Sequence, residues 1–213
     1  MTVEREKEMD ELLEGILAAR PKGHRRLVAL AGPPACGKST LAVDLAARLE
    51  QAGHPTKVVP MDGFHLHNQI LLDRGLLSRK GAPETFDVAG FASLVARLTK
   101  KQEIFFPVFD RQRDIAIAGA EVVSEACQTV ILEGNYLLLD APEWRGLCEH
   151  WSLSIWLDVP FPVLRERLIK RWLVHGLMPE EAAQRAEEND LRNAALVGEA
   201  RLKADLILRG VSV

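Results

Sequence analysis

The stretch from Leu27 to Gly53 constrains the fold of this chain more than any other part of its sequence. A short apolar run, Leu27–Ala31, leads into a glycine-bounded turn, and a helical pattern follows over Lys38–Gln51. Residues 32–39 read GPPACGKS and match G-x-x-x-x-G-K-[ST] in the strand-to-helix context that a phosphate-binding loop requires. The pattern therefore predicts a phosphate-binding loop at the end of a buried strand.

Each residue type in this loop suits a nucleoside triphosphate. The glycines allow backbone angles that aim several N–H groups inward at a helix N-terminus. Lys38 adds a positive charge for the β- and γ-phosphates, Ser39 a hydroxyl ligand for Mg²⁺, and Thr40 a further hydroxyl. Cys36 is interpreted as a small residue that fills the loop, with a redox-regulated thiol as the alternative. The predicted nucleotide-binding residues are Gly32, Pro33, Pro34, Ala35, Cys36, Gly37, Lys38, Ser39 and Thr40.

Length and composition predict one globular domain over residues 1–213, since 47% of the residues are hydrophobic and 27% are charged. The net charge of −3 offers no basic stripe for a nucleic-acid partner. Three cysteines without paired spacing predict a reduced, cytoplasmic protein. No apolar run approaches the ~20 residues that span a bilayer, so no membrane partner is expected. An amphipathic helix over residues 3–20 should pack beside the first strand, and a homodimer or membrane-surface contact is the alternative.

Apolar runs alternate with helical patterns along the whole chain. Runs that are apolar throughout and separated by helices predict an α/β fold, with a parallel sheet covered by helices on both faces. Ligands of such sheets bind at the carboxyl ends of the strands. The expected strands are Leu27–Ala31, Thr56–Met61, Thr129–Gly134, Leu153–Pro160 and the segment ADLILRG, and Val88–Leu98 is a further expected helix.

Two acidic residues end predicted strands and are candidates for the chemistry. Asp62 follows the strand Thr56–Met61, where it can accept the proton of an attacking hydroxyl or orient Mg²⁺; a helix or turn cap is the alternative. Glu133 ends the apolar run of the strand Thr129–Gly134 and is placed to act on Mg²⁺ directly or through water, with a strand-end salt bridge as the alternative. His65 is a candidate substrate contact, whereas His67 is expected to have no role.

The order of GPPACGKST, MDGF, PVFDR, ILEGNYLLL and a late arginine-rich segment resembles the uridine kinase, pantothenate kinase and phosphoribulokinase superfamily. It is most similar to bacterial nucleoside/nucleotide-kinase-family proteins described as fructose transport system kinases. The resemblance spans Leu27 to Gly210. It implies a five-stranded parallel sheet of P-loop kinase topology, ATP as the phosphoryl donor, an acceptor region at about 62–115 and a small helical lid at about 161–190. It also implies that Asp62 is the catalytic base, that Glu133 lies near the metal and that Asp87 faces substrate hydroxyls.

The segment PVLRERLIKRWLVHGL carries the arginines expected in such a lid. Arg167 and Arg171 are four residues apart, so they share one helix face and can point together at a phosphate. Such guanidinium groups stabilise the charge of a transferring phosphoryl group, and closing them over the site excludes water. A solvated helix face that pairs with Glu166 is the alternative.

The acceptor region departs from the relatives it resembles. Uridine kinases carry a tyrosine and a histidine here, whereas this chain has Phe109 and no histidine, and its only tyrosine is Tyr136. Asp110, Arg111, Arg113 and Asp114 form a polar patch that suits a polyhydroxylated or anionic acceptor, with an exposed charged hairpin as the alternative.

The sequence thus predicts an enzyme that transfers the γ-phosphoryl group of ATP to a hydroxyl of a pantothenate-like, nucleoside-like or sugar-like molecule. The alternative function is a non-catalytic or slowly hydrolysing NTP-binding regulator, associated with a transporter.

Overall fold

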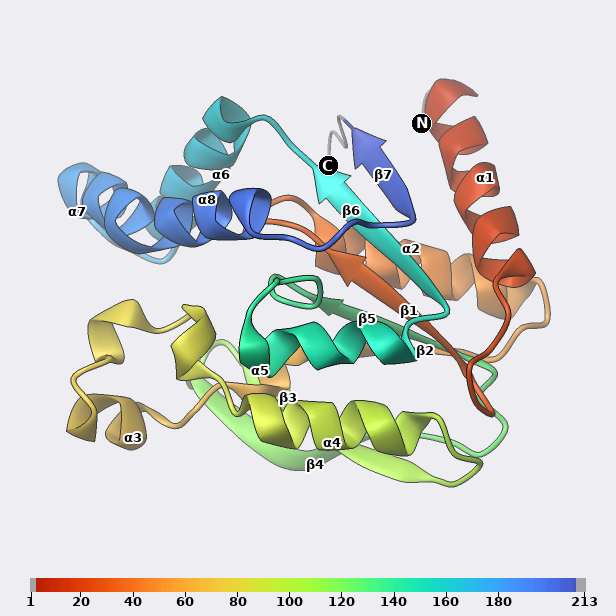
Figure 1. The fold of residues 1–213 in the computed structure, drawn as a ribbon. Coiled ribbons are helices and arrows are strands. Elements are labelled where there is room, and N and C mark those ends of the chain that lie inside the picture. Colours follow the sequence, from red (N-terminus) through yellow and green to blue (C-terminus); the bar gives the residue numbers. More distant parts are fainter. Residues whose placement is uncertain (1–2, 210–213) are drawn as a thin grey trace.

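The computed structural model describes residues 3–209 and is built around a five-stranded parallel sheet in the order β2-β5-β1-β6-β7. Helices cover both faces of this sheet (Figure 1), which confirms the predicted α/β architecture. The strands are β1 (Arg26–Ala31), β2 (Thr56–Pro60), β5 (Thr129–Gly134), β6 (Leu153–Asp158) and β7 (Leu206–Arg209).

Helices separate the successive strands of the main sheet along the chain, so they can serve as the crossover connections that parallel strands require. The predicted bounds of α2 and α4 match the structure. The helices are α1 (Val3–Ala18), α2 (Lys38–Gln51), α3 (Asn68–Asp73), α4 (Val88–Leu98), α5 (Pro142–Arg145), α6 (Phe161–Val174), α7 (Pro179–Arg185) and α8 (Leu191–Glu199), with a π-helical turn at Ala186–Asp190 and a 3₁₀ turn at Met61–Phe64.

Side chains of the central strand alternate between two hydrophobic cores. Val28 and Leu30 face the core that α1, α2 and α6 cover, while Leu27 and Ala29 face the core that α4 covers. Because both faces are buried, the strand is apolar throughout rather than alternating. Figure 1 shows α2 on one face of the sheet and α4 with α5 on the other.

Helix α1 packs its apolar face into the first of these cores. Met9, Leu12 and Ile16 are buried there, and the helix ends at Ala18, two residues before its predicted end. No helix within the described residues combines the length and apolar character needed to traverse a lipid bilayer.

A β-hairpin outside the main sheet is a feature that the sequence pattern did not predict. β3 (Ile104–Asp110) and β4 (Ile115–Val123) pair antiparallel and lie along the sheet edge below α4 (Figure 1). A Cβ atom on Gly63 would lie 2.1 Å from the carbonyl oxygen of Pro107, so only glycine permits this close approach. The hairpin brings its tight turn next to the end of β2.

Arg25, which immediately precedes β1, ties together the chain segments at the opposite end of the sheet. Its side chain is fully buried. Its guanidinium donates hydrogen bonds to five backbone carbonyls, those of Leu98, Lys100, Gln102, Ser124 and Cys127. Three of these carbonyls belong to the end of α4 and the turn after it, and two belong to the turn after β4. One side chain therefore supplies hydrogen bonds to the backbone of both segments.

We expect Arg25→Met to lower the free energy of unfolding by about 3 kcal/mol or more, because buried carbonyls would lose a charged donor. Urea-induced unfolding followed by circular dichroism measures the loss. Arg20→Met, at an exposed position, is the matched control and should stay within about 0.5 kcal/mol of wild type. Equal effects of the two substitutions would contradict this role of Arg25.

Candidate active site

The loop between β1 and α2 presents backbone N–H groups to one cavity. Gly37 is the N-cap of α2 with φ of 99°, a left-handed conformation that glycine tolerates, and no side chain caps the helix. The first N–H groups of a helix have no intrahelical partner, so an anion can bind them. Cys36 is buried, and a Cβ atom on Gly32 would lie 2.7 Å from its Sγ atom, so the thiol fills the inside of the loop.

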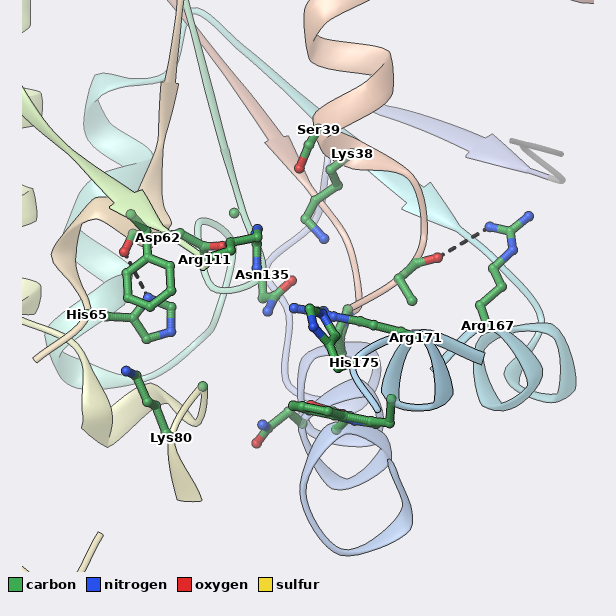
Figure 2. Close-up of a pocket in the computed structure, with 18 of the residues that line it drawn as sticks. Lys38, Ser39, Asp62, His65, Lys80, Arg111, Asn135, Arg167, Arg171 and His175 are labelled. Carbon is green, nitrogen blue, oxygen red and sulfur yellow. Dashed lines mark hydrogen bonds and ion pairs between the residues drawn. The ribbon is translucent and has the colours of Figure 1, made fainter. Parts of the chain in front are cut away.

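Lys38 bends back over this loop. Its Nζ atom donates hydrogen bonds to the carbonyl oxygens of Gly32 and Pro33, at 3.0 and 2.9 Å, and its side chain is buried. Figure 2 shows the Lys38 ammonium group at the edge of the cavity. This is the placement that a phosphate-binding lysine requires.

The cavity has a volume of about 950 Å³ and gathers most of the predicted site residues. Figure 2 shows side chains from α2, the end of β2, the hairpin turn and α6 converging on it. The predicted residues that line it are Pro34, Ala35, Gly37, Lys38, Ser39, Thr40, Asp62, His65, Arg111, Glu133, Arg167 and Arg171. Those that do not line it are Gly32, Pro33, Cys36, Asp87, Asp110 and Arg113.

Glu133 and Ser39 meet where β5 ends. Glu133 lies two residues after Ile131 and so faces α2, where the Ser39 hydroxyl donates a 3.0 Å hydrogen bond to its Oε1 atom. Burial raises the pKa of Glu133 and the charge of Asp62 adds to this, while Lys38 and the Ser39 hydrogen bond oppose it. A buried carboxylate beside another carboxylate is an arrangement that a divalent cation stabilises.

The donors at this point fit Mg²⁺ bound together with a polyphosphate. Within the described part of the chain, no cluster of three histidine, cysteine or acidic side chains could hold a metal by itself. Mg²⁺ usually takes one or two protein ligands and completes its shell with water and phosphate oxygens. Ser39 and Glu133 together match that requirement.

Asp62 lies on the other side of Glu133 from the phosphate loop, in the 3₁₀ turn that follows β2. Its Oδ2 atom accepts a hydrogen bond from the Nη2 atom of Arg111 in the hairpin turn. The two atoms lie 2.6 Å apart, so the residues form an ion pair. The ion pair holds the carboxylate at the cavity wall beside Arg111 (Figure 2).

His65 is held between two aromatic rings. Its ring centroid lies 4.1 Å from that of Phe86 and 4.7 Å from that of Phe109. Its Nδ1 atom lies 2.8 Å from the backbone carbonyl oxygen of Asp62. Burial lowers the pKa of His65, and the nearby charge of Asp62 opposes this only in part.

Three predicted substrate residues lie outside the cavity. Asp87, predicted to face substrate, is the N-cap of α4, accepts a hydrogen bond from the N–H of Gly90 and does not line the cavity. Asp110 accepts hydrogen bonds from the backbone N–H and the Nε atom of Arg113. Asp110 and Arg113 fix the hairpin turn, whereas Arg111 and Asp114 of the predicted patch line the cavity.

The two predicted arginines of the lid, Arg167 and Arg171, both lie on α6 but make different contacts. Arg167 donates a 3.3 Å hydrogen bond to the carbonyl oxygen of Ala35, at the rim of the phosphate loop. Arg171 forms no ion pair or hydrogen bond with any side chain in the described part of the chain; its guanidinium lies 5.8 Å from the ring centroid of Trp172. Burial lowers the pKa of Arg171, and the charge of Arg111 adds to this. A cation so placed at a cavity wall suits an anionic ligand.

Several cavity residues had not been predicted to take part, among them Lys80, Asn135, His175 and Arg185. Asn135 comes directly after β5, so the strand-end rule that identified Glu133 could also have found it. Lys80 and Asp114 are 34 positions apart and form an ion pair that no local pattern reveals. Tyr136 is buried, and its hydroxyl donates a hydrogen bond to the carbonyl of Gly81 rather than facing the cavity.

The segment 78–80 is joined to the predicted lid by side-chain hydrogen bonds. Arg79 donates a 2.7 Å hydrogen bond to Oδ1 of Asn189, whose Nδ2 atom donates to the carbonyl of Lys80. Arg185 donates to the carbonyl of Ser78. Asn189 therefore has a structural role at this junction.

Comparison with known proteins places this site among kinases. No family model matches the chain. The crystal structure of a "putative fructose transport system kinase" from Silicibacter sp. TM1040 is 52% identical, with a TM-score of 0.91, and the match covers 94% of this chain and 98% of that chain. "Putative uridine kinase C227.14" of Schizosaccharomyces pombe is 38% identical over 216 residues, covering 94% of this chain and 89% of that protein. A pantothenate kinase of Myxococcus xanthus is 32% identical over 176 residues, covering 78% of this chain but 54% of that enzyme.

The partly buried imidazole of His65 should make the stability of the protein depend on pH. Because the native pKa of His65 is lowered, the unfolded chain takes up the proton first as the pH falls through about 6.5. This contribution makes the wild type less stable at lower pH. We expect the free energy of unfolding of His65→Phe, relative to wild type, to rise between pH 7.5 and pH 5.5.

Urea unfolding of both proteins at pH 7.5, 6.5 and 5.5 measures this difference. A difference in free energy that does not change with pH would contradict a depressed pKa at His65.

Proposed function

Because the chain belongs to the superfamily of P-loop kinases that contains uridine kinases, pantothenate kinases and phosphoribulokinase, we propose that it transfers the γ-phosphoryl group of ATP to a hydroxyl group of a small molecule. The observation that carries the proposal is that Asp62 and the phosphate loop line the same cavity. A protein that only binds nucleotide has no need of a carboxylate at that point.

The donor side of the cavity supplies binding groups for a triphosphate. The uncapped N-terminus of α2 offers backbone N–H groups, and Lys38 can exchange its contacts with loop carbonyls for contacts with phosphate oxygens. Arg171 adds a positive charge from the opposite wall, where negative charge develops on the transferring group. We assign Arg167 to the same task, at the rim near Ala35.

Ser39 and Glu133 would hold Mg²⁺, Ser39 through its hydroxyl and Glu133 directly or through water. The ion, when bound, neutralises charge on the phosphate oxygens. These two residues hydrogen-bond to each other. Their contact keeps both oxygens at the place where the ion would bind.

Asp62 activates the acceptor in this mechanism. The acceptor oxygen attacks the γ-phosphorus, the bond between that phosphorus and the β,γ-bridging oxygen breaks, and ADP leaves. The proton of the acceptor hydroxyl passes to the Asp62 carboxylate. Arg111 holds that carboxylate at the cavity wall before the acceptor arrives.

We expect Asp62→Asn to lower acceptor-dependent ADP formation by about 10²–10⁴-fold, because an amide cannot accept the proton. ATP binding should survive, since Asp62 is not part of the phosphate loop. A coupled assay of ADP release measures the first quantity, and the shift in melting temperature on adding ATP measures the second.

Asp110→Asn is the matched control for this experiment, because Asp110 is an acidic residue of the neighbouring hairpin that does not line the cavity. It should retain acceptor phosphorylation within a few-fold. If Asp62→Asn turns over like wild type, Asp62 is not the base. If wild type itself shows no acceptor-dependent ADP release with a broad panel of alcohols, the regulatory alternative replaces the kinase.

We further expect Glu133→Gln to raise the Mg²⁺ concentration for half-maximal ADP formation by about 10-fold or more, because a carboxylate near the ion is lost. Glutamine keeps an acceptor for the Ser39 hydroxyl, so the local fold should persist. Titration of Mg²⁺ at saturating ATP measures the change. Glu143→Gln, on the exposed side of α5, serves as the control, and an equal Mg²⁺ requirement in both variants would exclude a metal role for Glu133.

A further inference from the structure

The cavity continues past Asp62 to a wall that neither the phosphate loop nor the predicted lid provides. We call His65, Lys80, Arg111 and Asp114 the acceptor wall, since all four line the cavity near Asp62. Figure 2 shows His65 and Lys80 together on the side of the cavity away from α2. The hydrogen bonds within this wall determine what it can still bind.

The ammonium group of Lys80 is fully engaged. Its Nζ atom lies 2.6 Å from Oδ1 of Asn68, 3.0 Å from the carbonyl oxygen of Asp114 and 2.7 Å from Oδ1 of Asp114. An ammonium group has three hydrogens, so these three acceptors use all of them. The Lys80 side chain is only 11% exposed. Lys80 therefore offers no free donor to a ligand.

Asp114 keeps hydrogen-bonding capacity on its carboxylate. Each oxygen receives one donor, Oδ1 from Lys80 and Oδ2 from Asn68 at 2.7 Å, and each oxygen has a second lone pair. The side chain is half exposed toward the cavity. Asp114 can therefore accept hydrogen bonds from ligand hydroxyls.

His65 is a second free acceptor. Its Nδ1 atom faces a carbonyl oxygen, which can only accept, so in the neutral ring Nδ1 carries the hydrogen and Nε2 carries the lone pair. Burial and the neighbouring cations favour that neutral ring. No described residue hydrogen-bonds to Nε2, and the ring lines the cavity.

The charges of this wall cancel in pairs. Lys80 is paired with Asp114, and Arg111 is paired with Asp62, so this wall carries no net positive charge for an anionic acceptor. A ligand carboxylate would lie beside Asp62 and Asp114 without a free counter-ion, and like charges at short range repel. Ligand hydroxyls, in contrast, would find two unused acceptors.

We infer that the acceptor is an uncharged molecule with adjacent hydroxyl groups, a neutral polyol, and that Asp114 and His65 determine this specificity. One hydroxyl takes the phosphoryl group at Asp62, and its neighbours donate hydrogen bonds to Asp114 and Nε2 of His65. The inference rests on the proposed kinase function and narrows its acceptor. Sugars, sugar alcohols and the ribose of nucleosides share this chemistry.

Matched pairs of acceptors test the inference on the wild-type protein. Glycerol and glycerate, D-glucitol and D-gluconate, and panthenol and pantothenate each differ by a hydroxymethyl group in place of a carboxylate. D-Fructose and uridine are added to distinguish sugars from nucleosides. ADP release with each compound gives kcat/KM.

We expect the neutral compounds to exceed their carboxylates by about 10-fold or more in kcat/KM, since one hydrogen bond to a charged group is worth about that factor. Equal or better use of the carboxylates overturns the inference and leaves the kinase function standing. ADP release that no acceptor stimulates overturns both.

Asp114→Asn separates a binding role from a structural one. Asp114 has φ of 55°, a conformation that asparagine tolerates well, and the amide oxygen can still accept from Lys80. We expect KM for the neutral acceptor to rise about 10-fold with little change in kcat or in KM for ATP. The preference for neutral compounds over carboxylates should also shrink, because the charge of Lys80 is no longer cancelled.

Asp110→Asn, four residues earlier in the same hairpin turn, is the control. It should change neither the acceptor KM nor the preference for neutral compounds. His65→Phe keeps the ring between Phe86 and Phe109 but removes Nε2, and it should raise the acceptor KM in the same way. If Asp114→Asn and His65→Phe both keep the wild-type acceptor KM and the wild-type preference for neutral compounds over carboxylates, the inference is overturned.

Discussion

The parallel pairing of β5 between β1 and β2 is the constraint on which the site depends. Glu133 is paired with Leu30 on one side and with Pro60 on the other. This register brings the phosphate loop after β1 and Asp62 after β2 to the two flanks of one buried carboxylate. Successive side chains of a strand face opposite ways, so a slip of one residue would turn Glu133 away from α2 and toward the core under α4.

The same arrangement concentrates uncompensated charge at the cavity. Glu133 is buried beside Asp62, and Arg171 forms no direct ion pair among the described residues, although the charges of Asp190 and Asp62 partly offset its burial. Such charges are costly unless a ligand completes them. A triphosphate with its magnesium ion carries both of the missing counter-charges. The Lys80–Asp114 pair, by contrast, is complete in itself, and so the acceptor half of the cavity differs from the donor half in electrostatic character.

Sequence reasoning succeeded where function depends on local order along the chain. Each of these elements is a single run of consecutive residues: the phosphate loop, α2 and β5. The bounds of α2 and β5 agree with those predicted from the sequence. It failed where function depends on tertiary contacts. An acidic residue before a helix reads equally as a substrate contact or as a cap, and Asp87 is a cap.

The hairpin shows the same limit. Its strands carry few buried side chains because they form a separate two-stranded sheet, so their apolar pattern is weak. Without the hairpin, neither the role of Arg111 nor the approach of Lys80 to Asp114 follows from the sequence. Of the four charged residues in the turn, Arg111 pairs with Asp62 and Asp114 pairs with Lys80, while Asp110 and Arg113 pair with each other.

The hydrogen bonds between segment 78–80 and the helices beyond α6 have a mechanical consequence. Arg79 contacts Asn189, and the carbonyls of Ser78 and Lys80 accept hydrogen bonds from that helical region. Any swing of those helices must either break these bonds or carry the backbone of Lys80 with it. Lys80 in turn anchors Asp114, so a movement of those helices would be transmitted to the side of the cavity that Asp114 lines.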